Sequence, residues 1–212
     1  MADNIEVFKQ NSIRIRDRLG AIYVDPFQTE GSPADAAFVL ITHDHYDHFS
    51  PEDIEKVICD RTVLVVPENM QGKAEGFTGR VAEIVTVKPG ESREISGLEV
   101  ETVPAYNSLK PFHPRSAGWV GYILTIAGKR IYIAGDTDAT KEAGAVRCDI
   151  ALVPIGGTYT MDAKKAAELV NTIGPETAIP VHYGGLVGKP SDGKVFEENV
   201  KPPTKVEFKI PF

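Results

Sequence analysis

Apolar and β-branched residues gather in short runs along the chain, and turn-forming residues separate these runs, a pattern that predicts β-strands. The runs cover residues 5–16, 22–24, 37–42, 62–66, 81–87, 98–103, 118–126, 130–134 and 177–181. Gly128 and Lys129 separate two of the runs and predict a tight hairpin there. The pattern therefore indicates a chain dominated by strands.

Two segments carry helix signals instead. Ser50 is a good N-cap residue, Pro51 suits the first helical position, and Ile54, Val57 and Ile58 mark one apolar face. A second helix is predicted over residues 161–172, because four apolar residues recur at helical spacing before Gly174 stops the helix. These four are Ala166, Leu169, Val170 and Ile173.

The order of these elements favours one layered architecture. Strands come first, and helices then alternate with strands in both halves, which is typical of two mixed β-sheets packed together with helices on the outer faces. We therefore expect an α/β (α+β) fold, an αββα sandwich. No long linker interrupts the 212 residues, so residues 1–212 are expected to form a single domain.

Composition narrows the possible partners. The net charge of −7 and the lack of a basic stripe argue against nucleic acid as a partner. The chain shows no signal-peptide pattern and no apolar run near the roughly 18 residues that span a bilayer, so no membrane partner is expected. Cys59 and Cys148 lie far apart in the sequence, which favours a reduced, cytoplasmic protein.

Three of the five histidines fall within six residues, directly after the apolar run that ends near Ile41. Residues two apart in extended backbone point the same way, so His43 and His45 can reach one metal ion. Asp47 and His48 follow around a turn and can serve a second ion nearby. Four potential ligands in this alternation predict a metal site rather than a solvated turn.

The ligand types indicate what the metals would do. Imidazoles and carboxylates leave a borderline divalent ion open to water, whereas closed structural sites usually use thiolates. A bound ion lowers the pKa of water from 15.7 to about 7 and so provides hydroxide at neutral pH, and two ions about 3.5–4 Å apart can share that hydroxide. The pattern favours a hydrolase.

Three other places offer the missing ligands. Asp136 follows a predicted strand and a glycine, where a carboxylate can bridge two ions. His182 ends another strand beside Gly184 and Gly185, which leave room for an ion or a ligand. His113 lies in a proline-bracketed loop, where a histidine is more often inert.

These residues together form a recognisable motif. The sequence His43-x-His45-x-Asp47-His48, Asp136 in a Gly-Asp-Thr setting and His182 in Pro-x-His resemble the metallo-β-lactamase superfamily. More narrowly, the chain resembles the small single-domain metal-dependent hydrolases related to ascorbate-6-phosphate lactonase. The resemblance runs from about residue 5 to residue 187, and it includes Val24-Asp25-Pro26 and the segment 154–161.

The resemblance implies a ligand set and a fold. It implies an αββα sandwich with the site at one edge between the sheets. It assigns His43 and His45 to one ion, and Asp47, His48 and His182 to the other. Asp136 would bridge the two.

One position departs from the family pattern. The family usually has a histidine in an Ala-x-His-Ser segment, and this chain has Asn107 there. Either the first site loses a ligand, with the Asn107 carbonyl as a weaker substitute, or His113 folds back to replace it. We favour His113, because the loop is restricted and the chain has no other histidine left.

We therefore expect a hydrolase with two divalent metal ions, zinc first, with manganese or iron as alternatives. Asp47 and Asp136 are the candidate catalytic residues, and the substrate is expected to be a small anionic lactone or other ester, or a phosphodiester. Tyr183, Thr158 and the backbone at 156–157 are candidates for substrate contact, and Lys110 and Arg115 for attraction of an anion. A catalytically silent metal-binding interaction module is the alternative, and a homo-oligomer is possible.

Overall fold

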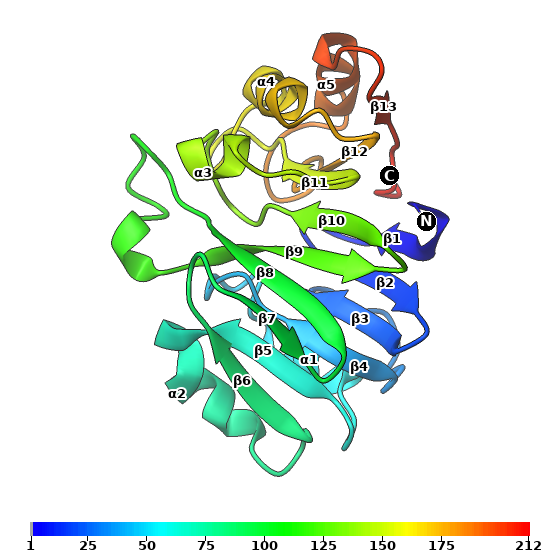
Figure 1. Cartoon of the computed structure of the whole chain (residues 1–212), viewed down its shortest axis with the longest axis vertical. Coiled ribbons are helices and arrows are strands. Elements are labelled where there is room, and N and C mark those ends of the chain that lie inside the picture. The colour runs from blue at the N-terminus through cyan, green and yellow to red at the C-terminus, as the bar shows by residue number, and fades with distance from the viewer. Residues whose placement is uncertain (1) are drawn as a thin grey trace.

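Two β-sheets form the centre of the molecule (Figure 1). The computed structural model describes residues 2–212. The first sheet has six strands, in the order β1-β2-β3-β4-β5-β6. Their bounds are β1 Ile5–Val7, β2 Ile13–Asp17, β3 Gly20–Val24, β4 Ala36–Leu40, β5 Val63–Pro67 and β6 Glu83–Val87.

The second sheet has seven strands, in the order β13-β12-β11-β10-β9-β8-β7. Their bounds are β7 Ser92–Ile95, β8 Leu98–Pro104, β9 Val120–Ile126, β10 Lys129–Ile133, β11 Ile150–Pro154, β12 Thr177–Val181 and β13 Lys205–Val206. Both sheets are mixed, because β3 to β6 and β10 to β13 pair in parallel while the other neighbours pair antiparallel.

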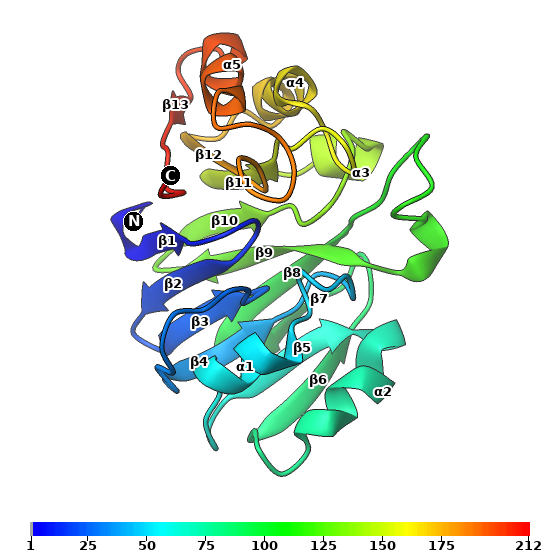
Figure 2. The same ribbon diagram turned by 180° about the vertical axis from the view of Figure 1, so that it is seen from behind.

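The helices lie outside the two sheets. Figures 1 and 2 show α1 and α2 beside the first sheet and α3, α4 and α5 beside β11 and β12 of the second. Their bounds are α1 Pro51–Val57, α2 Gln71–Ala74, α3 Lys141–Gly144, α4 Ala163–Ile173 and α5 Asp192–Asn199, with short 3₁₀ turns at Ala2–Asn4, Glu68–Met70, Glu75–Phe77 and Arg115–Ala117. The architecture is the predicted αββα sandwich.

Alternation along the strands explains these layers. In β4, Phe38 and Leu40 point into the core between the sheets. Val39 and the following Ile41 lie on the outer side of the sheet and pack against α1 and α2. Successive side chains of a strand face opposite ways, so an all-apolar strand must be covered on both faces. That requirement places α1 and α2 outside the first sheet.

Local signals set the helix ends where the sequence predicted them. Ser50 caps α1 by accepting a hydrogen bond from the Asp53 amide at 3.3 Å, with Pro51 as the first helical residue. In α4, Asp162 caps the start and Gly174, with φ of 66°, forms the end. All four residues predicted to face inward on α4 are buried.

The structure corrects the sequence-based elements in one place and extends them in others. The run predicted as one strand over residues 5–16 is two strands, because the chain turns between them and Gln10 adopts a φ of 51°. Six elements were not predicted from the sequence, namely β7, β11, β13, α2, α3 and α5. Most of these are short or, like β11, buried on both faces and therefore without a polar–apolar alternation.

Within residues 2–212, no helix is both long enough and apolar enough to cross a lipid bilayer. That the whole chain forms one domain stays a prediction.

Gly121 of β9 is required by the packing of two neighbouring strands. A Cβ atom there would lie 2.6 Å from the carbonyl oxygen of Ala134 and 2.8 Å from that of Ile133. Both obstacles are backbone atoms, which cannot rotate away. They also lie directly before Gly135 and Asp136, so the close approach fixes the chain that leads into the site.

We therefore predict that Gly121→Ala lowers the free energy of unfolding by about 1–3 kcal/mol, the usual cost of overpacking. Gly72→Ala is the matched control, because a Cβ on this helical glycine meets nothing within 4 Å. It should leave stability unchanged or raise it by up to about 1 kcal/mol. Denaturant unfolding of both variants measures the difference, and equal stability of the Gly121 variant and the parent would contradict the packing argument.

Candidate metal centre

The predicted ligands converge at one edge of the sandwich, from both sheets. His43 and His45 follow β4 of the first sheet, Asp136 follows β10 and His182 follows β12 of the second. The carboxyl ends of parallel strands meet at the same edge of a sheet, which explains why ligands so far apart in sequence come together. The loop between β8 and β9 carries His113 to the same edge.

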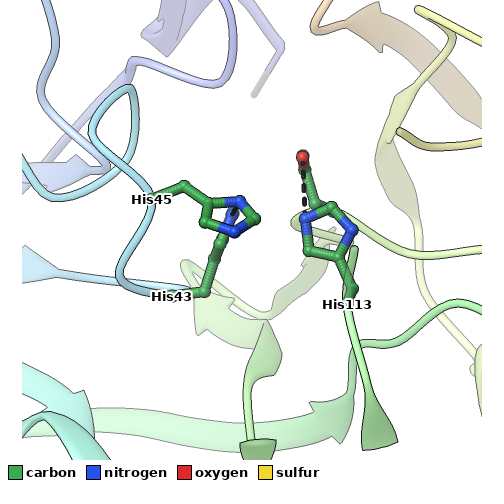
Figure 3. Close-up of side chains that lie close together, drawn as sticks. His43, His45 and His113 are labelled. Atoms are coloured by element: carbon green, nitrogen blue, oxygen red, sulfur yellow. Dashed lines mark hydrogen bonds and ion pairs between the residues drawn. The ribbon is translucent and has the colours of Figure 1, made fainter. Parts of the chain in front are cut away.

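Four residues form the first cluster: His43, His45, His113 and Asp136, with one donor atom each within 4.8 Å of the others. His43 Nε2 lies 3.0 Å from His45 Nδ1. The ring of His113 comes within 5.1 Å of that of His43 and 4.8 Å of that of His45, centroid to centroid. Figure 3 shows the His113 ring lying across from the other two, on a different segment of the chain.

Three residues form the second cluster: Asp47, His48 and His182. The two imidazoles approach through their Nε2 atoms at 3.1 Å and stack at an interplanar angle of 18°. Asp47 Oδ2 lies 3.3 Å from His182 Nε2. The second cluster thus presents two nitrogens and one oxygen to a common point.

Asp136 lies between the clusters. Its Oδ2 is 3.3 Å from His113 Nε2 in the first cluster, while its Oδ1 is 3.5 Å from His48 Nε2 and 3.4 Å from His182 Nε2 in the second. One carboxylate oxygen therefore faces each cluster. This is the arrangement of a bridging ligand.

A buried carboxylate behind the second cluster sets the direction of His48. Asp25, fully buried after β3, accepts a hydrogen bond from His48 Nδ1 at 2.7 Å and others from Asn11 and from the amide and hydroxyl of Thr42. His48 Nδ1 therefore carries a proton, and Nε2 is the nitrogen that faces the cluster. A carboxylate that orients a metal-binding histidine in this way also raises its basicity.

The Thr42 hydroxyl fixes the tautomer of His43. It has one proton, which it donates to Asp25 Oδ2 at 2.6 Å, so it must accept from His43 Nδ1 at 3.0 Å. His43 Nε2 is left as the lone-pair nitrogen that faces His45. The chain thus prepares both histidines as ligands through one hydrogen-bonded group around Asp25.

Asn107 does the same for His113. Its Oδ1 accepts hydrogen bonds from the His113 backbone amide at 3.2 Å and from His113 Nδ1 at 2.9 Å. Its Nδ2 donates to the Tyr159 carbonyl at 2.9 Å, which fixes which end of the amide faces the histidine. Asn107 Oδ1 thus faces His113 rather than the cluster, and His113 occupies the place that the sequence left open.

The charges around Asp136 shift several pKa values in the metal-free chain. Burial alone would raise the pKa of Asp136, but the imidazoles of His182 and His48 outweigh it and hold that pKa well below its usual range. Burial and the nearby His48 keep the pKa of His43 well below its usual value. Burial lowers the pKa of His48, yet the carboxylates of Asp136 and Asp25 raise it overall to about 9.

Two observations show that the clusters fit divalent metal ions. Within residues 2–212, the buried His113 Nε2 and Asp136 Oδ1 make no hydrogen bond, although such atoms normally have a partner. The imidazole nitrogens pair at 3.0 Å and 3.1 Å, and two nitrogens bound to one zinc at the tetrahedral angle are about 3.3 Å apart. Metal ions would satisfy all of these atoms together.

Trp119 supports the first cluster from below. Its ring lies 5.0 Å from those of His43 and His45 and 5.6 Å from that of His113, and it is 8% exposed. The indole meets the His43 ring at 46° and the rings of His45 and His113 edge to face, at 71° and 69°, so that its bulk restricts their rotation. This role of Trp119 was not predicted from the sequence.

The backbone bends sharply where two of these side chains enter the site. Asp25 and His182 adopt left-handed conformations with φ of 46° and 57°, which Asp and His tolerate better than most residues. Gly156 makes room for the second bend, because a Cβ there would lie 2.4 Å from the His182 carbonyl oxygen. The 156–157 backbone was predicted as a substrate contact; in the structure Gly156 packs against the chain at His182, and that a substrate contacts this backbone stays a prediction.

A cleft of about 470 Å³ opens over both clusters. His45, Asp47, Asp136 and His182 form its base. Tyr183, predicted as a substrate contact, instead lines a neighbouring pocket, and Thr158 is absent from the cleft lining within the described chain. The candidate cations are occupied elsewhere: Lys110 Nζ donates to the carbonyls of Gly157 and Thr160, and Arg115 pairs with Glu142 at 2.6 Å.

Comparison with known proteins places this site in a family. The profile of the Beta-lactamase superfamily domain matches residues 4–182. The chain belongs to the metallo-β-lactamase superfamily. The matched range contains all seven predicted metal ligands, from His43 to His182.

Similar proteins share both sequence and fold. The chain is 36% identical over 174 residues to a metal-dependent hydrolase of Thermoplasma acidophilum, covering 76% of this chain and 75% of the relative. It is 31% identical over 198 residues to one of Pyrococcus abyssi, covering 87% of each. A crystal structure described as a putative metal-dependent hydrolase, from Parabacteroides distasonis, superposes with a TM-score of 0.82 at 30% identity, covering 98% of this chain and 93% of the other. The chain is thus a metal-dependent hydrolase of this superfamily.

The residues behind the ligands were not predicted from the sequence. Thr42 and Trp119 carried no signal of their own, and Asp25 was noted only as part of Val24-Asp25-Pro26. A carboxylate that directly follows a buried strand, as Asp136 also does, is the signal that singles out Asp25.

We predict that Asn107→Ala weakens metal binding about 10–100-fold, the usual cost of losing a group that orients a ligand, with little effect on folding. His113 would keep its position in the chain but lose the hydrogen bond that turns Nε2 toward the cluster. Titration with zinc, followed by competition with a chelator, measures the affinity.

Ser108→Ala is the control for this loop, because the Ser108 side chain is exposed and only its backbone amide bonds to Asp138. It should bind metal as the parent does. His113→Ala should lose at least as much affinity as Asn107→Ala. Parental affinity in the Asn107 variant would show that this amide does not position His113.

Proposed function

We propose that this chain hydrolyses a small lactone or other carboxylic ester, or a phosphodiester, by a metal-bridging hydroxide. The observation that carries the proposal is Asp136, whose two oxygens face two separate clusters of imidazole and carboxylate donors. The resemblance to the lactonase branch of the superfamily favours the ester, and the superfamily's shared site chemistry leaves the phosphodiester open.

The seven candidate ligands divide into two sets. His43, His45 and His113 would hold one ion, and Asp47, His48 and His182 the other, with Asp136 between them. Metal ions bound there would lower the pKa of water to about 7, supply the nucleophile and stabilise the negative charge that develops on the substrate. Zinc is our first choice, with manganese or iron as alternatives, because nitrogen and oxygen donors suit all three.

Asp47 is the candidate for proton handling. Its side chain lines the cleft and is 12% exposed, so a water molecule in the cleft can reach it. Burial raises its pKa, but contact with His182 and the charge of His48 outweigh this and lower the pKa below its usual value. Asp47 is therefore an anion at neutral pH, able to orient the attacking water or accept its proton.

We also infer a reducing, cytoplasmic setting, supported by Cys59 and Cys148, which are both free thiols. Burial raises the pKa of the Cys148 thiol to about 12, so it has little thiolate character. A small-molecule substrate is the expected partner.

Asp136→Asn tests the proposed function. It keeps the shape of the side chain but removes the charge that faces both clusters, so kcat/KM should fall by about 100-fold or more, beyond the range for outer-shell partners. The assay is a panel of lactones, phosphodiesters and thioesters, each measured with zinc, with manganese and after treatment with a chelator.

Asp44→Asn is the matched control, because this aspartate lies in the same motif but pairs with Lys73 at the surface. It should hydrolyse the panel at the parental rate. Chelation should abolish activity and added metal should restore it. Equal rates for Asp136→Asn and the parent would reject a mechanism through the two clusters.

A further inference from the structure

Apolar side chains form the walls of the cleft above the metal-binding clusters. Beyond the ligands at its base, the cleft is lined by Tyr46, Phe112, Tyr159, Leu186 and Val187. These residues come from four separate segments: the histidine motif, the β8–β9 loop, the stretch after β11 and the stretch after β12. Four segments thus place apolar groups around the ligand residues at the bottom of the cleft.

These walls are exposed to solvent although they are apolar. Phe112 is 41% exposed, Tyr159 40% and Leu186 49%. Adjacent large apolar groups left in water usually mark a binding surface, and a cleft with a few convergent polar groups is the usual form of a small-molecule site. The position directly above the clusters makes the substrate the occupant that these groups would meet.

The aromatic wall is held in place by the same contacts that position a candidate ligand. Phe112 and Tyr159 pack edge to face with ring centroids 4.7 Å apart. Phe112 directly precedes His113, and the Tyr159 carbonyl accepts the hydrogen bond from Asn107. The wall is therefore fixed relative to the reacting centre, as a specificity surface must be.

Charge makes the cleft unsuited to an anionic group away from its base. Over the described residues 2–212, no lysine or arginine lines it. Lys110 and Arg115 belong to the same loop but are bound to carbonyls and to Glu142. A phosphate or carboxylate held against the aromatic wall would lose hydration without gaining a cationic partner.

We propose that the substrate carries an uncharged apolar group, alkyl or aromatic, next to the scissile bond, and that this group packs on Phe112 and Tyr159. Any negative charge of the substrate then lies at the scissile group itself, over the metal clusters. This inference rests on the proposed function for the reaction and adds the class of substrate.

The test compares two lactones with the same ring and the same chain length, γ-octanolactone and its analogue with a terminal carboxylate on the chain. The metal-loaded parent should prefer the alkyl lactone in kcat/KM by at least about tenfold, because the terminal carboxylate would lose hydration against the apolar wall. Phe112→Ala should bring that ratio close to one, mainly by raising KM for the alkyl lactone.

Leu109→Ala is the matched control, because Leu109 lies in the same loop, is 97% exposed and does not line the cleft. It should keep the parental preference. Calorimetry with the two hydrolysis products, 4-hydroxyoctanoate and its dicarboxylate analogue, provides a readout that needs no turnover. The alkyl product should bind more tightly to the parent, and Phe112→Ala should remove the difference.

The two proposals fail in different ways. If neither lactone nor any phosphodiester or thioester is hydrolysed, the proposed function fails, while the calorimetric difference between the products still decides the character of the cleft. If the carboxylate lactone is hydrolysed as fast as the alkyl one and its product binds as tightly, the apolar substrate is wrong while the hydrolase is upheld. An equal loss for both lactones in Phe112→Ala would likewise contradict a specificity role.

Discussion

The buried carboxylate of Asp136 is the constraint on which the rest of the site depends. It lies 4% exposed between two clusters of imidazoles, with Asp47 beside it and Asp25 behind. Three carboxylates in so small and dry a space repel one another unless positive charge lies between them. Although burial lowers the pKa of His48, the carboxylates of Asp136 and Asp25 raise it overall to about 9, and divalent ions would supply positive charge between the carboxylates. The arrangement of the ligand side chains therefore suits bound cations, whatever the substrate is.

The positions of these side chains follow from the architecture. Ends of strands from two sheets meet at one edge, and each contributes one or two ligands there. Packing then controls the precise approach: Gly121 lets β9 lie close to the chain that carries Asp136, and Gly156 lets the chain pass His182. A metal centre built this way has its geometry set by the core, while the loops above it are free to determine specificity.

The β8–β9 loop contributes both to the geometry of the metal centre and to substrate specificity. Asn107 orients His113 from below and is tied to the Tyr159 backbone, while Phe112 and Tyr159 form the aromatic wall above. The same hydrogen-bonded unit therefore places a candidate ligand and a substrate surface. Asn107, which stands where the family pattern has a histidine, was the reason for considering a catalytically silent module. Because Asn107 orients His113 toward the first cluster, that reason no longer holds.

Much of this arrangement could be predicted from the sequence, for identifiable reasons. The ligand-type residues between His43 and His48 come at alternate positions directly after a buried strand, and Asp136 and His182 each follow a strand. Their spacing and their place at strand ends were enough to identify them as candidate ligands. The helix caps at Ser50 and Gly174 are local signals, so the start of α1 and the end of α4 could also be predicted. The roles of Thr42 and Trp119 could not be assigned, because they arise from contacts between segments far apart in sequence. For Asp25, the position directly after a buried strand was a usable signal, but the sequence did not show its partners. The hydrogen bonds from Lys110 to backbone carbonyls could not be predicted for the same reason. They leave the cleft walls apolar, where the sequence had suggested a cation that attracts an anionic substrate.

The most direct test of the central claim is a crystal structure of the metal-loaded chain, with anomalous scattering measured at the absorption edges of zinc, manganese and iron. Our account predicts two peaks about 3.5–4 Å apart, with Asp136 bound to both ions. One ion should be ligated by His43, His45 and His113 and the other by Asp47, His48 and His182, at about 2.0–2.2 Å if the metal is zinc. A single peak, or a first site from which His113 is turned away, would contradict it.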